Sequence, residues 1–378
     1  MDKPIELNKP IKNFFYCSAV DGCASNSHLG MRIIKFLKEN NYQLVTKSKF
    51  ADIIFINTCI AVNHTEKISK KTIEFFINKY GSDKNKKIVV CGCLPKVMNI
   101  ENENVIKIKN ISEINKLIDT KKKIEDIKSN RFNKGLYRKY EDDEFYIQIC
   151  SGCLGNCNYC IIKSAIGNLK SRSREDIIKE FKKGIESGYK KFVLWGDDCG
   201  CYGKDIGTNF TDLFKTFSEI SDEAIFKIVY FEPNWLIEQY QGLKQFIKNN
   251  RIYYINIPLQ SGSNNVINLM GRHYDINKTK EILKEIKEIS PNIFLETCIL
   301  FGFPGETHQD FLDSIEAGKY FDCANFIVFS ERPNTKAAKM KNKVSKNIKI
   351  ERGEFIKEII KKYPKKYTVN DADDIIES

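Results

Sequence analysis

Four cysteines lie within the stretch CSGCLGNCNYC at residues 150–160. Three of them, Cys153, Cys157 and Cys160, have the spacing C-x3-C-x2-C. A structural zinc site usually has paired CxxC knuckles and four ligands, and a ferredoxin run has C-x2-C-x2-C-x3-C-P, so neither matches. We therefore expect these three thiolates to bind three irons of a [4Fe–4S] cluster and to leave the fourth iron open. Cys150 ends a predicted strand and is expected to pack in the core.

The cysteines of the N-terminal half form a second candidate set. Cys23 opens a predicted helix, and Cys59 and Cys93 each follow a predicted strand. We expect these three to meet at one edge of a sheet, where α/β folds bind ligands, and to hold a second cluster. Cys17 and Cys91 are expected to lie within strands and not to be ligands. Four more are expected to be small buried side chains, with a functional role left open for the first three: Cys199, Cys201, Cys298 and Cys323.

The composition of the whole chain limits where such chemistry can occur. Its 378 residues, 42% of them hydrophobic, are enough for two packed domains. No signal peptide and no membrane-spanning stretch is present, so we expect a cytoplasmic protein without a membrane partner, whose thiols stay reduced. The formal charge of +12 favours a polyanionic partner such as RNA. The lack of GxxxxGK[ST] and GxGxxG motifs argues against nucleoside triphosphate or dinucleotide chemistry.

Short apolar strands alternate with helical patterns in the first third of the chain. NFFYCSA, DIIFINT and KIVVCG are predicted strands, and residues 28–38 and 65–79 are predicted helices. This alternation predicts a small, doubly wound parallel α/β sheet in a domain of residues 11–120. The charged, aperiodic residues 121–142 are expected to form a linker.

Six further strands are predicted beyond this linker, with helical patterns between them. They lie near residues 146, 191, 226, 253, 293 and 324, and Ser173 followed by Asp176 marks the start of one helix. The six strand–helix units predict a partial (β/α)6 TIM-like barrel over residues 143–360, with its active site at the C-terminal ends of the strands. Residues 361–378 are expected to be a short tail. The three-cysteine motif follows the first barrel strand.

A three-cysteine cluster with an open iron at the mouth of a partial barrel resembles the radical S-adenosylmethionine (SAM) enzymes. The match includes the aromatic Tyr159 before the last cysteine. In that family the open iron chelates SAM, and one electron cleaves the sulfonium to release a 5′-deoxyadenosyl radical. The resemblance implies SAM as a cofactor and an electron donor such as flavodoxin or ferredoxin. It also implies SAM-contacting residues after the second and fourth barrel strands: Gly196, Asp198, Gln260, Ser261 and Gly262.

The N-terminal motifs narrow the resemblance to the methylthiotransferases, which insert a methylthio group into tRNA bases or a ribosomal protein. The family motifs G-C-x-x-N, N-[ST]-C and G-C fall on Cys23, Cys59 and Cys93. Later blocks, among them IPLQSGSNNVINLM and FGFPGETHQDF, follow in family order. Within the family, CLGNCNYCIIKSAIGNL is most similar to the branch that acts on N6-threonylcarbamoyladenosine in tRNA.

This resemblance implies two [4Fe–4S] clusters with different tasks. In the family's scheme, one SAM methylates a sulfur attached to the auxiliary cluster, which here would use Cys23, Cys59 and Cys93. Another SAM is cleaved at the cluster on the C-x3-C-x2-C motif. The deoxyadenosyl radical removes a substrate hydrogen, and the substrate carbon collects the methylthio group. The expected activity is therefore methylthiolation of an unactivated C–H, and no further catalytic residue is expected.

Several departures from the family pattern keep the substrate open. The family's aspartate before GFPGET is Cys298 here, and Leu29-Gly30-Met31 replaces acidic and serine residues. The family's C-terminal TRAM domain, which contacts the substrate, is expected to be missing. A peptide or protein substrate, such as a ribosomally made natural product, is the alternative to tRNA. A two-cluster electron-transfer or iron-sensing protein is the alternative of another class. The sulfur donor, the methylthiolation site and the oligomeric state are not identified.

Overall fold

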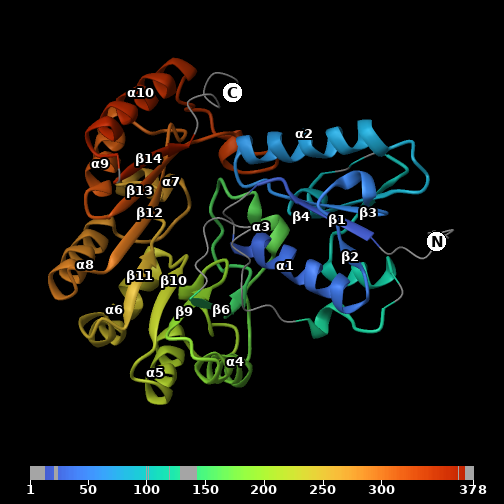
Figure 1. Ribbon diagram of the computed structural model, residues 1–378. Coiled ribbons are helices and arrows are strands. Elements are labelled where there is room, and N and C mark those ends of the chain that lie inside the picture. Colours follow the sequence, from blue (N-terminus) through green and yellow to red (C-terminus); the bar gives the residue numbers. More distant parts are fainter. Residues whose placement is uncertain are drawn as a thin grey trace. The chain divides into compact units, whose positions relative to one another are not determined.

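The computed structural model describes residues 13–20, 24–98, 100, 102–118, 120–127, 143–364 and 366–370. The chain forms two compact units, of residues 1–142 and 143–378 (Figure 1). Cys23 lies outside the described residues. Among the described helices, none is long and apolar enough to cross a membrane.

The first unit is built on a five-stranded parallel sheet with the order β2-β1-β3-β4-β5. Its helices α1 (Ala24–Glu39) and α2 (Asn63–Tyr80) lie on opposite faces of the sheet (Figure 1). This confirms the predicted doubly wound α/β fold. The strands are β1 (Asn13–Ser18), β2 (Gln43–Leu44), β3 (Ile53–Thr58), β4 (Lys87–Gly92) and β5 (Val105–Lys107).

The start of the expected linker packs on this first unit. Ile124 and Ile127 are buried at the ends of a short 3-10 turn (Ile124–Asp126). Arg32 of α1 donates hydrogen bonds to both of their carbonyl oxygens, at 2.8 and 3.0 Å. The sequence did not predict this contact. The two isoleucines follow the charge run Lys121–Lys123, and alone they show no helical or strand period. Residues 128–142 lie outside the described part.

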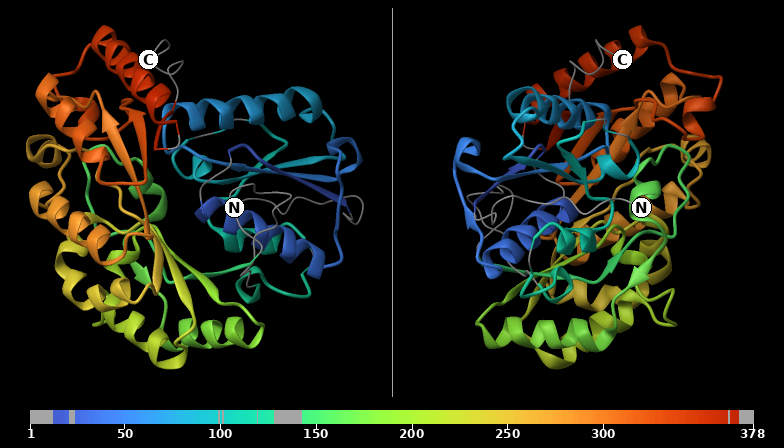
Figure 2. Two further views of the ribbon diagram at one scale, coloured as in Figure 1. Left: turned by 60° about the vertical axis from the view of Figure 1, so that its left-hand side comes forward. Right: turned by 90° about the vertical axis from the view of Figure 1, so that its right-hand side faces the viewer.

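The second unit contains a seven-stranded sheet with the order β14-β13-β12-β11-β10-β9-β6, in which every neighbouring pair is parallel. The sheet curves, and its helices cover the outer side (Figure 2). All six predicted strands are present, which confirms the partial TIM-like barrel. They are β6 (Glu144–Gln148), β9 (Lys191–Trp195), β10 (Ile225–Val229), β11 (Ile252–Asn256), β12 (Phe294–Phe301) and β13 (Cys323–Val328).

The helices of this unit cover the sheet through a core rich in phenylalanine. The ring of Phe181 on α4 lies 4.6 Å from that of Phe192 on β9 and 4.7 Å from that of Phe217 on α5, measured between ring centroids. Such contacts hold α4 against the sheet and against the next helix. The longer helices are α4 (Arg174–Glu186), α5 (Phe210–Ile220), α6 (Pro233–Lys248), α8 (Ile276–Ile289), α9 (His308–Gly318) and α10 (Lys346–Lys362), and the shorter ones are α3 (Ile162–Ile166) and α7 (Asn264–Leu269).

One strand of the barrel was not predicted. β14 (Tyr367–Asn370) lies in the expected tail and pairs in parallel with β13, with Ala324 opposite Tyr367. Tyr367 is buried in the cluster around Phe326. The strand is four residues long and follows Pro364, so its sequence has no clear strand pattern.

Candidate metal centres

The C-x3-C-x2-C motif lies in the segment that connects two short antiparallel strands, β7 (Cys150–Ser151) and β8 (Lys170–Ser171). Cys153, Cys157 and Cys160 are all half-buried. The Gly155 N–H donates a 3.0 Å hydrogen bond to the Cys153 sulfur. A Cβ at position 155 would lie 3.2 Å from the Cys153 sulfur and 3.8 Å from the Cys157 sulfur. Glycine therefore leaves space beside both thiols, as a cluster bound there requires.

Burial controls the protonation of these thiols. It raises the pKa of Cys157 to about 11 and also raises the pKa values of Cys153 and Cys160. Asp198 adds to the increase at Cys153. Such thiols are protonated in the bare protein at neutral pH, so a metal must displace protons to bind. Three soft sulfur donors suit an iron–sulfur cluster better than a hard cation such as Mg²⁺.

Two carboxylates meet the first cysteine of the motif. Oxygens of Asp198 and Glu232 and the sulfur of Cys153 all lie within 4.8 Å of one another. Asp198 is buried and accepts hydrogen bonds from Trp235 Nε1 at 2.7 Å and from the Gly200 N–H at 3.1 Å. Burial, with Glu232 nearby, raises the pKa of Asp198 to about 7. A positively charged ligand group between the two carboxylates would relieve their repulsion.

The predicted residue Gly196 has a packing role at the end of β9. A Cβ at this position would lie 2.5 Å from the Cys150 sulfur. Cys150 is buried, as expected, and its thiol donates to the Asp198 carbonyl oxygen at 3.3 Å. The Cys201 thiol donates to the same oxygen at 3.1 Å. These contacts join the ends of β6 and β9 and hold the Asp198 backbone beside the cysteine loop.

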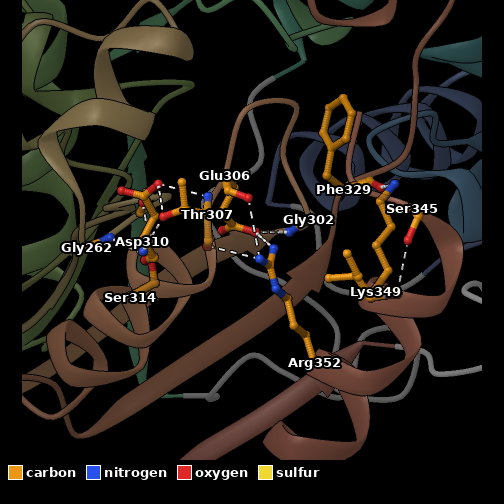
Figure 3. A network of polar contacts seen from close by, with 12 residues as sticks. Gly262, Gly302, Glu306, Thr307, Asp310, Ser314, Phe329, Ser345, Lys349 and Arg352 are labelled. Carbon is orange, nitrogen blue, oxygen red and sulfur yellow. Dashed lines mark hydrogen bonds and ion pairs between the residues drawn. The ribbon is translucent and has the colours of Figure 1, made fainter. Parts of the chain in front are cut away.

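Ser261 and Gly262 of the QSGS segment contact α9, and Figure 3 shows Gly262 near Ser314. The Ser261 hydroxyl is fully buried and lies 3.1 Å from the Ser314 hydroxyl, which also accepts from the Gly262 N–H at 2.9 Å. A Cβ on Gly262 would lie 2.1 Å from the Asp313 carbonyl oxygen. These two residues therefore fix the position of the segment through contacts with α9.

Gln260 has an unusual backbone conformation at the end of β11. Its φ is +71°, and Tyr230, after β10, has a φ of +63°. Residues other than glycine pay about 1–3 kcal/mol for such conformations, which gather at ligand sites. Hydrogen bonds of 2.8 Å to the Cys298 carbonyl oxygen and from the Leu300 N–H hold Gln260 there. The half-buried Gln260 side chain is thus the member of this segment best placed to meet a ligand.

Cys59 and Cys93 come together at one edge of the first unit's sheet. They directly follow Thr58 and Gly92, which face each other in the register of β3 and β4. Neighbouring strands are about 4.8 Å apart, so the two cysteines leave adjacent strand ends. The Cys93 N–H donates to the Thr58 carbonyl oxygen at 3.0 Å. Gly92 has a φ of +91°, and a Cβ there would lie 2.3 Å from that oxygen.

The motif that contains Cys23 is tied to the same edge through Asn26. The Asn26 side chain donates to the Thr58 carbonyl oxygen at 3.0 Å, and the Asn57 side chain donates to the Asn26 carbonyl oxygen at 2.7 Å. The asparagine of each of these two cysteine motifs therefore binds the backbone of the other motif. Cys91 is buried and its thiol donates to the Ile56 carbonyl oxygen at 3.5 Å, which agrees with a core position.

The sequence analysis did not identify Glu232 and Arg272 as site residues. Glu232 precedes α6 and Arg272 follows α7, and they form an ion pair of 3.1 Å beside the cysteine loop. Arg272 is buried, which is rare for an arginine and could have drawn attention only once the fold was known. In the sequence, Arg272 is flanked by Asn268, His273 and Asp275, so nothing in the local pattern marks it as buried.

Comparisons with known proteins agree with this geometry. Residues 147–317 match the family model of the radical SAM superfamily, and residues 16–114 match the uncharacterized protein family UPF0004. The probable threonylcarbamoyladenosine tRNA methylthiotransferase of Pyrococcus horikoshii is 32% identical over 85% of this chain and 78% of its own length. The chain belongs to the radical SAM methylthiotransferase family. It is a transferase, and the cofactors of its family are SAM and [4Fe–4S] clusters.

Relatives with two different names have similar sequence identity to this chain. The ribosomal protein uS12 methylthiotransferase RimO of Thermoanaerobacter is 30% identical over 90% of this chain and 81% of its own length. The threonylcarbamoyladenosine tRNA methylthiotransferase of Homo sapiens is 28% identical, and the chain covers 62% of it. Among solved structures, the radical SAM methyltransferase TsrM from Kitasatospora setae has a TM-score of 0.58 at 12% identity, covering 87% of this chain and 77% of that one. This last likeness shows the fold.

Proposed function

We propose that this methylthiotransferase acts on N6-threonylcarbamoyladenosine of tRNA with two [4Fe–4S] clusters. Cys153, Cys157 and Cys160 would hold the radical cluster, and Cys23, Cys59 and Cys93 would hold the auxiliary one. When bound, the clusters and SAM supply the radical and the sulfur that the reaction needs. The proposal is carried by the positions of the described cysteines: Cys59 and Cys93 follow the carboxyl ends of parallel strands in the first unit, and the C-x3-C-x2-C motif follows a parallel strand of the second unit, where such folds bind ligands.

The residues around Cys153 have the chemistry to bind SAM. Asp198 and Glu232 would accept hydrogen bonds from its ammonium group, because both carboxylates lie within 4.8 Å of the Cys153 sulfur. Gln260 would contact SAM beyond the end of β11. Ser261 and Gly262 would hold Gln260 in position through their contacts with α9. Gly196 would contribute by letting β9 approach Cys150 closely. An external electron donor such as a flavodoxin or ferredoxin completes the proposed set of partners.

The proposed tRNA substrate rests on the names of the relatives and on the charge of the chain. The relatives from Pyrococcus and human are named for threonylcarbamoyladenosine in tRNA. The net charge of +12 suits a phosphate-rich ligand. A second candidate is a protein or peptide substrate, because relatives named for ribosomal protein uS12 are 30 and 32% identical to this chain.

Mass spectrometry separates these two candidates. The protein is expressed in cells that lack their own methylthiotransferases, and digested tRNA nucleosides and tryptic peptides are compared with and without expression. A methylthio mass gain on threonylcarbamoyladenosine supports the proposal. A gain confined to a peptide, with tRNA nucleosides unchanged, refutes the proposed substrate and leaves the family's reaction in place. The variant Cys157→Ala serves as a negative control, because it removes a proposed cluster ligand.

A further inference from the structure

The segment of residues 269–272, at the C-terminal end of α7, is hydrogen-bonded to the cysteine loop. The Asn158 N–H donates to the Met270 carbonyl oxygen at 2.8 Å. The Asn158 side-chain amide donates to the Leu269 carbonyl oxygen at 2.9 Å. Gly271 has a φ of +69°, and a Cβ there would lie 3.1 Å from the Asn158 side chain. The loop between Cys157 and Cys160 is thus held by a segment that lies far away in sequence.

Arg272 ends this segment and is fixed by three contacts. Its Nη1 donates to the Tyr159 hydroxyl at 3.1 Å, and its Nη2 donates to the Pro258 carbonyl oxygen at 3.0 Å. Its Nη2 also lies 3.1 Å from Glu232 Oε1, while Nε is buried without a hydrogen-bond partner among the described residues. The side chain is only 5% exposed. A planar guanidinium held this way keeps its charge at a fixed place.

The charge of Arg272 acts on the proposed cluster ligands. Its guanidinium contacts Tyr159, which lies between Cys157 and Cys160 in the sequence. Lys163 Nζ binds the carbonyl oxygen of Cys153 in the same loop. The side chain of Arg272 is 5% exposed and that of its partner Glu232 is 15% exposed, so Arg272 is the more deeply buried charge of the pair. Net charge and hydrogen bonds near the sulfurs are among the factors that set the reduction potential of an iron–sulfur cluster.

We propose that Arg272 is a positioning residue of the radical cluster, and that its guanidinium stabilises the reduced state of a cluster bound to Cys153, Cys157 and Cys160. This inference rests on the proposed cluster ligands. Reduction adds one electron from an external donor and makes the cluster more negative by one charge. A buried cation beside two of the ligands favours that state. Through Tyr159 and Glu232, the same side chain holds the cysteine loop next to the proposed SAM-binding carboxylates.

The test is a redox titration of the reconstituted protein without SAM, monitored by electron paramagnetic resonance. Arg272→Met is expected to lower the reduced fraction of the radical cluster about tenfold at a fixed potential, which corresponds to a shift of about 59 mV to more negative values. Arg272→Lys keeps the charge and should stay near the wild-type potential. The control is Arg251→Met, since Arg251 also binds two backbone carbonyl oxygens but lies before β11, at the opposite end of the strands.

An unchanged potential in Arg272→Met, with the iron content of the wild type, would overturn the inference. If Arg272→Met fails to take up iron, Arg272→Lys is the deciding variant. A radical cluster with the wild-type potential in Arg272→Lys supports the electrostatic role. A change of tenfold or more in its ratio of reduced to oxidised cluster refutes that role. An equal shift in Arg251→Met would also refute it, because the effect would then not depend on the site. Failure of the proposed ligands gives a different result, since a variant with Cys153, Cys157 and Cys160 replaced by Ala would then keep the signal of the radical cluster.

Discussion

Single residues decide whether this chain can carry two clusters. Burial alone does not distinguish the proposed ligands from the other thiols of the described residues. Cys199 and Cys201 are fully buried, but the proposed ligand Cys59 is also buried, and Cys298 within β12 is half-buried, as Cys153 is. Substitution of single cysteines is therefore the way to tell ligands from structural thiols.

The first prediction concerns the radical cluster. The wild-type protein, reconstituted without oxygen, should hold about eight irons, as two four-iron clusters imply. Replacement of Cys153, Cys157 and Cys160 by Ala should halve that content and abolish the formation of 5′-deoxyadenosine from SAM. Iron analysis and chromatography measure both quantities. Cleavage of SAM by the triple variant would contradict the assignment.

The second prediction separates the auxiliary ligands from their neighbours. Cys59→Ala and Cys93→Ala should each lower the iron content while SAM cleavage remains measurable, because the proposed ligands of the radical cluster lie in the other unit. Cys91→Ala should keep all the iron and lose about 1 kcal/mol of stability, since it removes one buried atom from a strand. Cys17→Ala should also keep the iron. Loss of iron in these last two variants, with retention in the first two, would mean that the ligands are misassigned.

At the scale of elements, the turns that follow strands bring the ligands together. Gly92 ends β4, where any side chain would collide with β3. Gly92→Ala should therefore shift Cys93 and reduce auxiliary iron while leaving SAM cleavage intact. Gly188→Ala is the matched control, because Gly188 has a similar φ of +85° but no atom within 4 Å of its Cβ position. Equal iron loss in both variants would show that backbone strain, and not the contact with Thr58, is responsible.

The contact between α9 and α10 offers a stability prediction (Figure 3). Glu306 and Arg352 form a buried ion pair, and burial raises the pKa of Glu306 to about 7, although Arg352 opposes this. Arg352→Met leaves the carboxylate without its cation and should cost about 3–5 kcal/mol of unfolding free energy at pH 8.

The pH dependence of this loss follows from the direction of the shift. The folded protein binds more protons than the unfolded chain between the ordinary glutamate pKa of 4.5 and about 7, so stability falls as pH rises through that window. Urea denaturation should show a smaller loss for Arg352→Met at pH 5, where Glu306 is neutral. Glu306→Gln should lack this pH slope. Equal losses at pH 5 and pH 8 would contradict the raised pKa.

Elements with a strong local pattern were the ones that the sequence predicted. The six long barrel strands and both helices of the first unit have apolar periods that a single sequence shows clearly. β2 and β5, with two and three residues, are too short for a pattern, and β14 depends on its pairing with β13. The cysteine motifs were visible because spacing is a local property. The pair of Glu232 and Arg272 was not visible, because α6, β11 and α7 all lie between the two residues in the sequence and the pair forms only in the folded chain.

The whole molecule combines two ligand sets with an excess of positive charge. The chain covers about four-fifths of its relatives from Pyrococcus and Thermoanaerobacter. The two family models match residues 16–114 and 147–317, which include both proposed cluster sites. The names of these relatives give two different substrates, a tRNA and a ribosomal protein. The way in which the substrate is recognised should be reflected in the salt dependence of its binding to the intact protein.

The salt dependence of binding should differ between the two kinds of substrate. A tRNA substrate must be held through its phosphates, and each phosphate neutralised by Lys or Arg releases counterions. With six or more such contacts, the affinity for tRNA should fall on the order of a thousandfold between 50 and 200 mM salt. A peptide held by main-chain contacts and side-chain pockets should show a shallow dependence, since few ions are released. Fluorescence anisotropy with labelled tRNA across this range makes the measurement, and tight tRNA binding that does not change with salt would contradict recognition through the phosphate backbone.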